Sequence, residues 1–161
     1  MNHNPQRTTK PSLWLMVPLR LLQAFIGLIL LATALGKSLD IPGFADVVGT
    51  YQVLPEWSWM LVAVGMTGFE WVLGAWLLSG RKLTQAALVS AALHTAFFGW
   101  ASLALYRGLE LSNCGCFGVF LARPLTTATL WEDGFMVGFS LALALLARLH
   151  TCSMTQPALS S

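Results

Sequence analysis

The sequence predicts an all-α membrane protein whose four transmembrane helices form a single bundle. Of its 161 residues, 56% are hydrophobic and 10% are charged, and the mean hydropathy is +0.67. A soluble domain carries about 25% charged residues. Seven tryptophans agree with the membrane class, because tryptophan collects at membrane interfaces. Four separate apolar stretches also reach the length of about 20 residues that a helix needs to cross a bilayer.

The first apolar stretch is expected to be retained as a helix. It is longer than the core of a secretion signal, and no small-x-small cleavage site follows it. Polar tails are expected at 1–16 and 150–161, and no linker or repeat divides the domain at 17–149. The four spanning helices are expected at residues 17–36, 57–78, 84–105 and 131–149.

A short amphipathic helix is expected between the first two spanning helices. Ile41-Pro42-Gly43 is a turn signal, and Leu54-Pro55 closes the segment before the second span. Apolar residues recur between them at spacings of three and four, which predicts about two helical turns lying at the membrane interface. This helix either caps the bundle or binds a partner. The recurring residues are Phe44, Val47, Val48 and Tyr51.

The distribution of basic residues predicts the orientation, because cytoplasmic loops of membrane proteins carry an excess of Lys and Arg. Both termini are therefore expected in the cytoplasm of a bacterium, with the chain in its inner membrane. The loops after the first and third spans then face the periplasm. Basic residues on the cytoplasmic side are Arg7, Lys10, Arg20, Arg81, Lys82 and Arg148. The opposite side has Lys37, Arg107 and Arg123 among six acidic residues.

The loop after the third span contains a pair of cysteines, Cys114 and Cys116, separated by Gly115. An extended Cys-Gly-Cys spans about 7 Å, whereas the Cα atoms of a disulfide lie about 4.4–6.8 Å apart. A turn is therefore needed, and glycine permits the positive φ that such a turn requires. The pair predicts either a redox-active or metal-binding site, or a structural staple.

The environment of this pair favours redox chemistry over metal binding. The periplasm is oxidising, so disulfides form there, and Lys37 or Arg107 would lower a cysteine pKa if it approached the thiol. No metal is expected, because structural zinc takes four ligands and the outer loops contain no histidine. The third cysteine, Cys152, falls on the cytoplasmic side and is interpreted as an incidental thiol.

Three ionisable residues fall inside the apolar stretches: Arg20, Glu70 and His94. Their distances from the outer helix ends are about 24, 20 and 16 Å at 1.5 Å per residue. An isolated charge in lipid costs at least about 2.5–3.5 kcal/mol, so these groups are expected to face the interior. They form either a proton relay or polar quinone pocket, or, as favoured here, an Arg20–Glu70 ion pair with His94 nearby. Close helix packing is expected at Gly27, Gly65, Gly68 and Gly74.

An ordered set of short motifs from about Leu21 to Leu146 resembles the MauE/DoxX-type family of redox-associated membrane proteins, and most of all the MauE proteins of methylamine utilisation. The cysteine motif, residues 114–118, ends this set. Earlier members are Gly36-Lys37, Asp40, Phe44, Tyr51, Leu54-Pro55, Glu70, Gly74 and Arg107-Gly108.

This resemblance implies an accessory membrane protein for maturation of a periplasmic enzyme. The client would be the disulfide-rich small subunit of methylamine dehydrogenase, and the partner a periplasmic thioredoxin-like protein of the MauD type. Cys114 and Cys116 would be the redox pair, with Lys37, Asp40 and Arg107 as supporting residues.

Two classes of function remain open. In the first, the cysteine pair passes electrons or disulfides between a periplasmic thiol protein and either a membrane quinone or a second thiol pair. The sequence lacks that second pair, which favours a subunit that hands its disulfide to a partner. In the second class, the protein is a non-catalytic scaffold or transport factor. Whether the chain is an enzyme stays open. A net charge of +2 without a basic patch argues against nucleic-acid binding.

Overall fold

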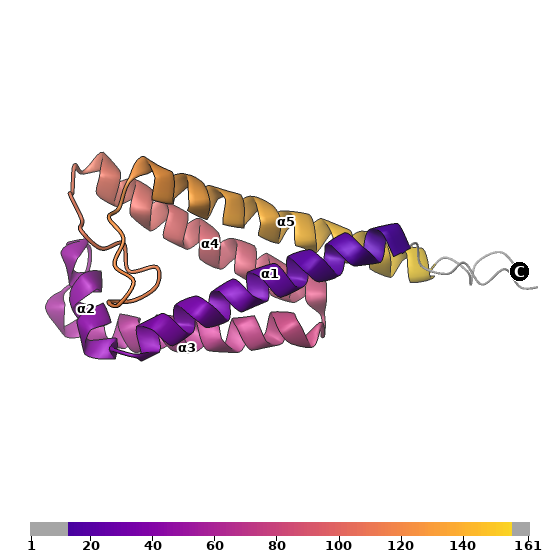
Figure 1. Cartoon of the computed structure of the whole chain (residues 1–161), viewed down its shortest axis with the longest axis horizontal. Coiled ribbons are helices and arrows are strands. Elements are labelled where there is room, and N and C mark those ends of the chain that lie inside the picture. The colour runs from indigo at the N-terminus through magenta and orange to yellow at the C-terminus, as the bar shows by residue number, and fades with distance from the viewer. Residues whose placement is uncertain (1–12, 156–161) are drawn as a thin grey trace, which may run out of the picture.

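The computed structural model describes residues 13–155, and its regular elements there are all α-helical (Figure 1). The predicted all-α class is therefore confirmed. The expected tails at 1–16 and 150–161 lie mostly outside the described residues. The elements are α1 (Leu13–Ser38), α2 (Ile41–Thr50), α3 (Glu56–Ser79), α4 (Leu83–Tyr106) and α5 (Thr127–Thr155).

Four of these helices are long and apolar enough to cross a membrane, and each contains one predicted stretch. The spans run over Met16–Ser38, Glu56–Ser79, Leu83–Tyr106 and Thr127–Thr151. Each helix extends a few residues beyond the predicted ends, because hydropathy marks the bilayer core whereas backbone hydrogen bonding continues into the interface. The chain is a multi-pass membrane protein built as a bundle of four spans.

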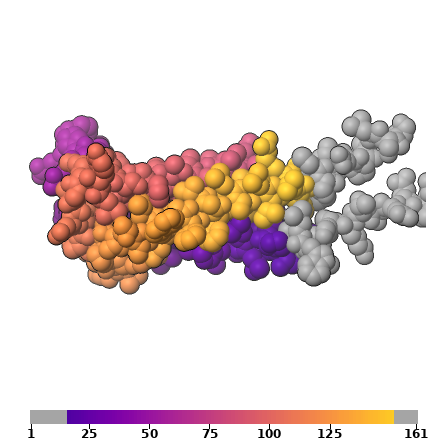
Figure 2. All heavy atoms as spheres, turned by 90° about the horizontal axis from the view of Figure 1, so that it is seen from above, coloured from indigo at the N-terminus to yellow at the C-terminus, as the bar shows by residue number. Residues whose placement is uncertain are grey.

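The bundle consists of two antiparallel pairs, α1 with α3 and α4 with α5. The pairs converge at the end that holds the α3–α4 turn and diverge at the end that holds α2 (Figure 1). The converging half contains the main hydrophobic core, where Ile26, Leu77 and Leu143 are fully buried. At the broad end, α2 and the connection between α4 and α5 lie together at the surface (Figure 2).

Helix α2 confirms the predicted amphipathic segment and runs for 10 residues. The carboxylate of Asp40 caps its first turn by accepting a hydrogen bond of 2.9 Å from the Gly43 N–H. Phe44 and Val48 are buried and pack with Ala63 of α3. The helix therefore covers the broad end of the bundle, and Asp40 serves α2 itself.

Glycines bring α1 and α3 together, as predicted, at two of the four positions. A methyl group on Gly74 would lie 3.2 Å from the Gly27 carbonyl oxygen, so the two backbones are in close contact. The prediction is wrong for Gly65 and Gly68, because neither would place a methyl group within 4 Å of a neighbour. Both stand on α3 before the point where α1 and α3 approach most closely.

Candidate redox site

Residues 113–118, which we name the Cys loop, fold into a tight turn that is organised by one side chain. Asn113 accepts a hydrogen bond of 2.9 Å from the Gly115 N–H through Oδ1. Its Nδ2 donates to the Gly118 carbonyl at 3.1 Å. Gly115 has a φ of +74°, which confirms the predicted need for a glycine between the two cysteines. The turn directs the side chains of Cys114 and Cys116 toward each other.

The two thiols lie close enough to interconvert between dithiol and disulfide with little movement. Their Sγ atoms are 2.7 Å apart, and the Cys116 N–H lies 3.4 Å from Cys114 Sγ. A disulfide bond is about 2.03–2.05 Å long. Both cysteines are thiols in the structure and both are half-buried. The pair can therefore close without refolding of the loop.

The two thiols differ in acidity because one hydrogen bond joins them. The hydrogen bond with the Cys116 thiol lowers the pKa of Cys114 to about 7, although burial opposes this shift. The same hydrogen bond raises the pKa of Cys116, and burial raises it further. The negative charge of Asp133 raises the pKa of both thiols. Cys114 is thus the sulfur that carries the thiolate.

The Cys loop packs directly on the end of α1 and on α2. A methyl group on Gly115 would lie 3.0 Å from Val47 Cγ1, so the loop is in van der Waals contact with α2. Gly118 has a φ of +75°, and a methyl group there would collide with the Gly36 carbonyl oxygen. A methyl group on Gly36 would in turn collide with the Phe117 carbonyl oxygen. Two glycines therefore allow the loop backbone to touch the α1 backbone.

Hydrogen bonds from distant residues fix the loop in this position. The Tyr51 hydroxyl, at the end of α2, donates to the Cys114 carbonyl at 2.8 Å. The Cys114 N–H donates to the Arg123 carbonyl at 2.7 Å. Burial raises the pKa of Tyr51, and the charges of the two cysteines raise it further, so the hydroxyl stays protonated as a donor.

Arg107 makes its hydrogen bonds to the end of α2, and its expected effect on a cysteine pKa stays a prediction. Its Nη1 donates to the carbonyls of Tyr51 and Gln52 at 3.0 and 3.3 Å, so it holds the end of α2. The charge of Lys37 lowers the pKa of Cys116, as expected for Lys37. The positive charge of Arg123 lowers the pKa of Cys114. It forms a bidentate ion pair with Glu132 at 2.9 and 2.8 Å. Sequence reasoning did not assign this role to Arg123, because Arg123 stands in the irregular segment between α4 and α5.

Lys37 is buried rather than placed at the outer surface, which corrects the expectation drawn from its position at a helix end. Its Nζ lies 2.6 and 2.7 Å from the two carboxylate oxygens of Glu70. The side chains are 3% and 1% exposed. Thr33 donates a further bond of 3.3 Å to Glu70. Helical side chains slant toward the N-terminus, so a lysine in the last turn of α1 reaches back into the bundle.

The expected Arg20–Glu70 ion pair is wrong. Arg20 is exposed and donates to Gln23 at 2.9 Å, and it lies near Gly80 at the converging end. The predicted depths of Arg20 and Glu70 start from the outer ends of α1 and α3, and these two ends are not level. The first turns of α3 pack on α2, where Trp59 and Ala63 contact it, so α3 extends past α1. Glu70 is consequently level with Thr33 and Lys37 rather than with Arg20.

His94 is buried inside the bundle on α4, as expected, and is held by its own helix. Its Nδ1 lies 2.8 Å from the Ser90 carbonyl oxygen and 3.3 Å from the hydroxyls of Ser90 and Ser140. A carbonyl can only accept, so Nδ1 carries the proton and Nε2 of the neutral ring is left as an acceptor. No described residue makes a hydrogen bond to Nε2.

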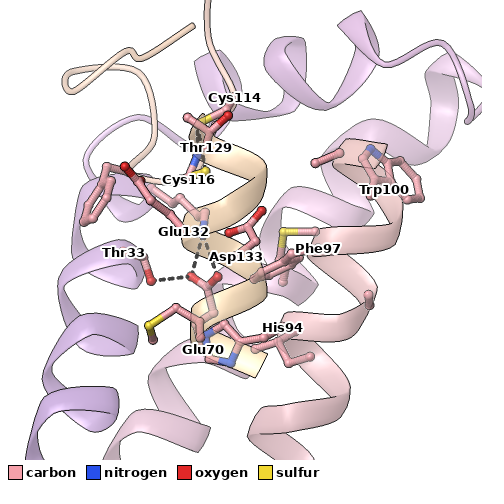
Figure 3. A pocket seen from close by; sticks show the side chains of 18 of the residues that line it. Thr33, Glu70, His94, Phe97, Trp100, Cys114, Cys116, Thr129, Glu132 and Asp133 are labelled. Carbon is pink, nitrogen blue, oxygen red and sulfur yellow. Dashed lines mark hydrogen bonds and ion pairs between the residues drawn. The ribbon is translucent and has the colours of Figure 1, made fainter. Parts of the chain in front are cut away.

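A cavity of about 1030 Å³ connects these groups. It lies between the two helix pairs at the broad end, and its wall includes both cysteines, Lys37, Glu70 and His94 (Figure 3). The lining residues that sequence reasoning missed include Phe97, Trp100 and Asp133. Asp133 had a usable signal, because it stands two residues inside the apolar stretch 131–149. Phe97 and Trp100 of α4 carried no usable signal, because aromatic residues are common in any membrane helix.

Within the described residues, no group of three or more His, Cys, Asp or Glu side chains could hold a metal ion. The side chains of this site that can change oxidation state by forming a disulfide are Cys114 and Cys116. The cavity beneath them could hold an organic molecule, with hydrogen-bonding groups contributed by Lys37, His94 and Asp133.

Comparison with known proteins agrees with this architecture. The family described as Methylamine utilisation protein MauE matches residues 15–147. Methylamine utilization protein MauE of Paracoccus denitrificans is 28% identical over 123 residues, which cover 76% of this chain and 66% of that protein. The aligned region thus spans just under two thirds of the relative. No solved structure shows a significant match. The match covers the first three spans, the Cys loop and the fourth span up to residue 147, and the chain belongs to the MauE family.

Proposed function

We propose that the protein exchanges disulfides through Cys114 and Cys116 and thereby supports maturation of a periplasmic enzyme of methylamine utilisation. The observation that carries this proposal is the 2.7 Å approach of the two thiols on a loop that is fixed from three sides. Strongly held cysteine pairs can be merely structural, but a staple needs no lowered pKa. Cys114 has a pKa of about 7, which suits a nucleophile.

The exchange proceeds through a mixed disulfide. The Cys114 thiolate attacks one sulfur of a partner disulfide, and the other partner sulfur leaves as a thiolate. Cys116 then loses its proton and attacks Cys114, which releases the partner as a dithiol and leaves a Cys114–Cys116 disulfide. The steps are reversible, so an oxidised Cys114–Cys116 pair converts a partner dithiol into a disulfide. We propose that the exchange partner is a periplasmic thioredoxin-like protein. The client whose disulfides mature would be the small subunit of an amine dehydrogenase.

The proposal requires the Cys loop to face the periplasm of a bacterial inner membrane, with both termini in the cytoplasm. The α3–α4 turn, with Arg81 and Lys82, supports this orientation, because it lies at the end opposite the Cys loop (Figure 1). A membrane-impermeant thiol reagent should label a variant that retains only Cys114 in intact spheroplasts. A variant that retains only Cys152 should stay unlabelled. The reverse pattern would invert the orientation.

The decisive experiment traps the intermediate. Cys116→Ser removes the resolving thiol, so Cys114 should accumulate in a mixed disulfide with its partner, visible as a larger species on non-reducing gels. Cys152→Ser is the control and should trap nothing. The double variant Cys114→Ser, Cys116→Ser should remain in the membrane but abolish maturation of the dependent dehydrogenase. Normal maturation in the double variant would refute the exchange function.

A non-catalytic scaffold is the second candidate, and one observation favours it. Phe120 and Leu121 follow the Cys loop and are 67% and 64% exposed, so they form an apolar surface on which a partner could dock. In that case the dithiol would only shape the loop. Phe120→Ser with Leu121→Ser should then block maturation while the double cysteine variant leaves it intact.

A further inference from the structure

The cavity at the broad end is larger than the structure needs for packing. Its volume of about 1030 Å³ is at the upper end of the range of about 300–1,000 Å³ typical for small-molecule sites. The wall is mostly apolar and includes the aromatic rings of Phe44, Phe97 and Trp100. Phe69 and Phe135 also line it and are 45% and 61% exposed, so the cavity is not sealed from its surroundings. A flat, apolar molecule from the bilayer could therefore enter it.

Two buried polar groups of the wall have hydrogen-bonding capacity left for a ligand. Lys37 is 2% exposed and uses two of its three N–H donors on Glu70, which leaves one donor. His94 is 5% exposed, and its Nε2 has no partner among the described residues. The site thus offers one cationic donor and one imidazole nitrogen within an apolar wall. Those are suitable partners for the oxygens of a ring that alternates between carbonyl and hydroxyl.

The cysteine pair lies in the wall of the same cavity, as Figure 3 shows for Cys114, Cys116, Glu70 and His94. A reduced pair needs an electron acceptor before it can exchange again, and within the described residues no second cysteine pair exists to serve as one. A molecule in the cavity would reach the sulfurs directly. A small-molecule acceptor in the cavity would therefore do the work of the second cysteine pair that the sequence lacks.

We propose that this cavity binds the ring of a membrane quinone, which reoxidises the Cys114–Cys116 pair. The inference rests on the proposed disulfide exchange and names its electron acceptor. The two thiols lose two electrons and two protons as the S–S bond forms. The quinone gains two electrons and two protons and leaves as a hydroquinone. Lys37 donates a hydrogen bond to one ring oxygen, and Asp133, in the wall beside the thiols, accepts a thiol proton.

A phospholipid chain is the alternative occupant, and the polar groups argue against it. An acyl chain would fill the apolar wall but would leave the third Lys37 N–H and the His94 Nε2 without partners in a low-dielectric site, which is costly. It would also accept no electrons. A quinone satisfies the apolar wall, the polar groups and the sulfurs together.

Two glycines of α3 supply a matched test of the binding site. Gly65 lines the cavity and Gly68 does not, and a methyl group at either position would have no neighbour within 4 Å. Gly65→Phe should fill the cavity and weaken binding of decylubiquinone by about tenfold or more, which corresponds to about 1.4 kcal/mol. Gly68→Phe carries the same change in helix propensity and should bind as the unmodified protein does. Binding is measured on purified protein in detergent, by equilibrium dialysis against empty micelles.

Electron transfer is measured separately with the reduced protein and decylubiquinone in the absence of oxygen. One quinone should be reduced for each dithiol oxidised, followed by the ultraviolet absorbance of the ring. Cys114→Ser with Cys116→Ser should still bind quinone and reduce none. Cys116→Ser should still trap its partner when it is combined with Gly65→Phe, which separates this site from the exchange function.

Several outcomes would overturn the quinone site. The first is that decylubiquinone partitions no more strongly into micelles with the protein than into empty micelles. The second is that Gly65→Phe and Gly68→Phe bind it equally. The third is that a phospholipid copurifies and is not displaced by decylubiquinone. If any of these occurs while Cys116→Ser still traps its partner, the exchange function stands and the cavity assignment fails. If quinone binds and is reduced but Cys116→Ser traps no partner, the cavity assignment stands and the exchange function fails.

Discussion

The ammonium of Lys37, near the end of α1, contacts both carboxylate oxygens of Glu70 on α3, at 2.6 and 2.7 Å. Both side chains are almost completely buried, at 3% and 1% exposure. The pair joins the two helices directly beneath the Cys loop, since the loop backbone touches Gly36, the residue before Lys37. It also neutralises two charges that would be costly to leave alone in an apolar interior.

Removing one member of this ion pair should destabilise the bundle more than removing both. Glu70→Ala strands the buried Lys37 ammonium, and breaking such a pair costs about 3–5 kcal/mol. Lys37→Ala with Glu70→Ala leaves no buried charge and should cost less than the sum of the two single changes. The free energy of unfolding in mixed detergent micelles, measured by SDS titration, gives the coupling.

Arg20 supplies the control for that cycle. It is exposed and bonded to Gln23 near the opposite end of α1, so Arg20→Ala and Glu70→Ala should have additive effects. Coupling between Arg20 and Glu70, with none between Lys37 and Glu70, would contradict the register of α1 against α3.

Gly118 should be required for its lack of a side chain as well as for its backbone conformation. Gly118 and Gly108 both have positive φ, at +75° and +70°, so alanine should strain each of them by about 1–2 kcal/mol. Only at position 118 would the new methyl group also collide with the Gly36 backbone. Gly118→Ala should therefore displace the Cys loop and increase thiol alkylation, whereas Gly108→Ala should leave thiol reactivity unchanged. Equal reactivity in the two variants would show that the loop does not dock on α1.

The Tyr51 hydroxyl should stabilise the position of the Cys loop. Tyr51→Phe removes the bond of 2.8 Å to the Cys114 carbonyl, and the loss of such a bond costs about 0.5–1.5 kcal/mol. Tyr106, the second tyrosine of the chain, is 90% exposed and provides a matched control. Hydrogen exchange at the Cys loop should speed up in Tyr51→Phe and stay unchanged in Tyr106→Phe. Faster exchange in both variants would point to a general loss of stability.

The architecture could be predicted because it depends on local properties of the sequence. Four uniformly apolar stretches specify four spans whatever their partners. The α2 helix follows from apolar residues at helical spacing. The expected turn at Ile41-Pro42-Gly43 is wrong, because these residues form the first turn of α2 after the Asp40 cap, where proline is tolerated. The turn at Gly115 follows from the geometry of two cysteines with one residue between them.

The partners of the buried charges could not be predicted, because they depend on how far one helix slides along another. The extension of α3 beyond α1 places Glu70 at Lys37 rather than at Arg20. The surroundings of the thiols depend on long-range contacts. The irregular connection from 107 to 126 folds back over the bundle, which brings Arg123 to the thiols and places the Cys loop near Asp133 of α5.

The acidity of Cys114 gives the most direct chemical test of the site. The hydrogen bond with the Cys116 thiol lowers the pKa of Cys114 to about 7 from its ordinary value of 9.0. Only the thiolate reacts with an alkylating reagent, so the rate at Cys114 in the reduced protein should rise with pH through a midpoint of about 7. Cys116→Ala removes the hydrogen-bond partner and should move that midpoint upward. Timed iodoacetamide labelling, followed by mass spectrometry of the peptide that contains Cys114, measures both midpoints.

The control is the reciprocal variant. Burial raises the pKa of Cys116, so in Cys114→Ala the remaining thiol should still react only at high pH, with a midpoint above that of Cys114 in the unmodified protein. The order of the two alkylation midpoints on the pH scale therefore tests the assignment of Cys114 as the nucleophile. A midpoint for Cys114 that is unchanged by Cys116→Ala would show that the two thiols share no proton. A lower midpoint for Cys116 than for Cys114 would reverse their roles, and the mixed disulfide would then form at Cys116.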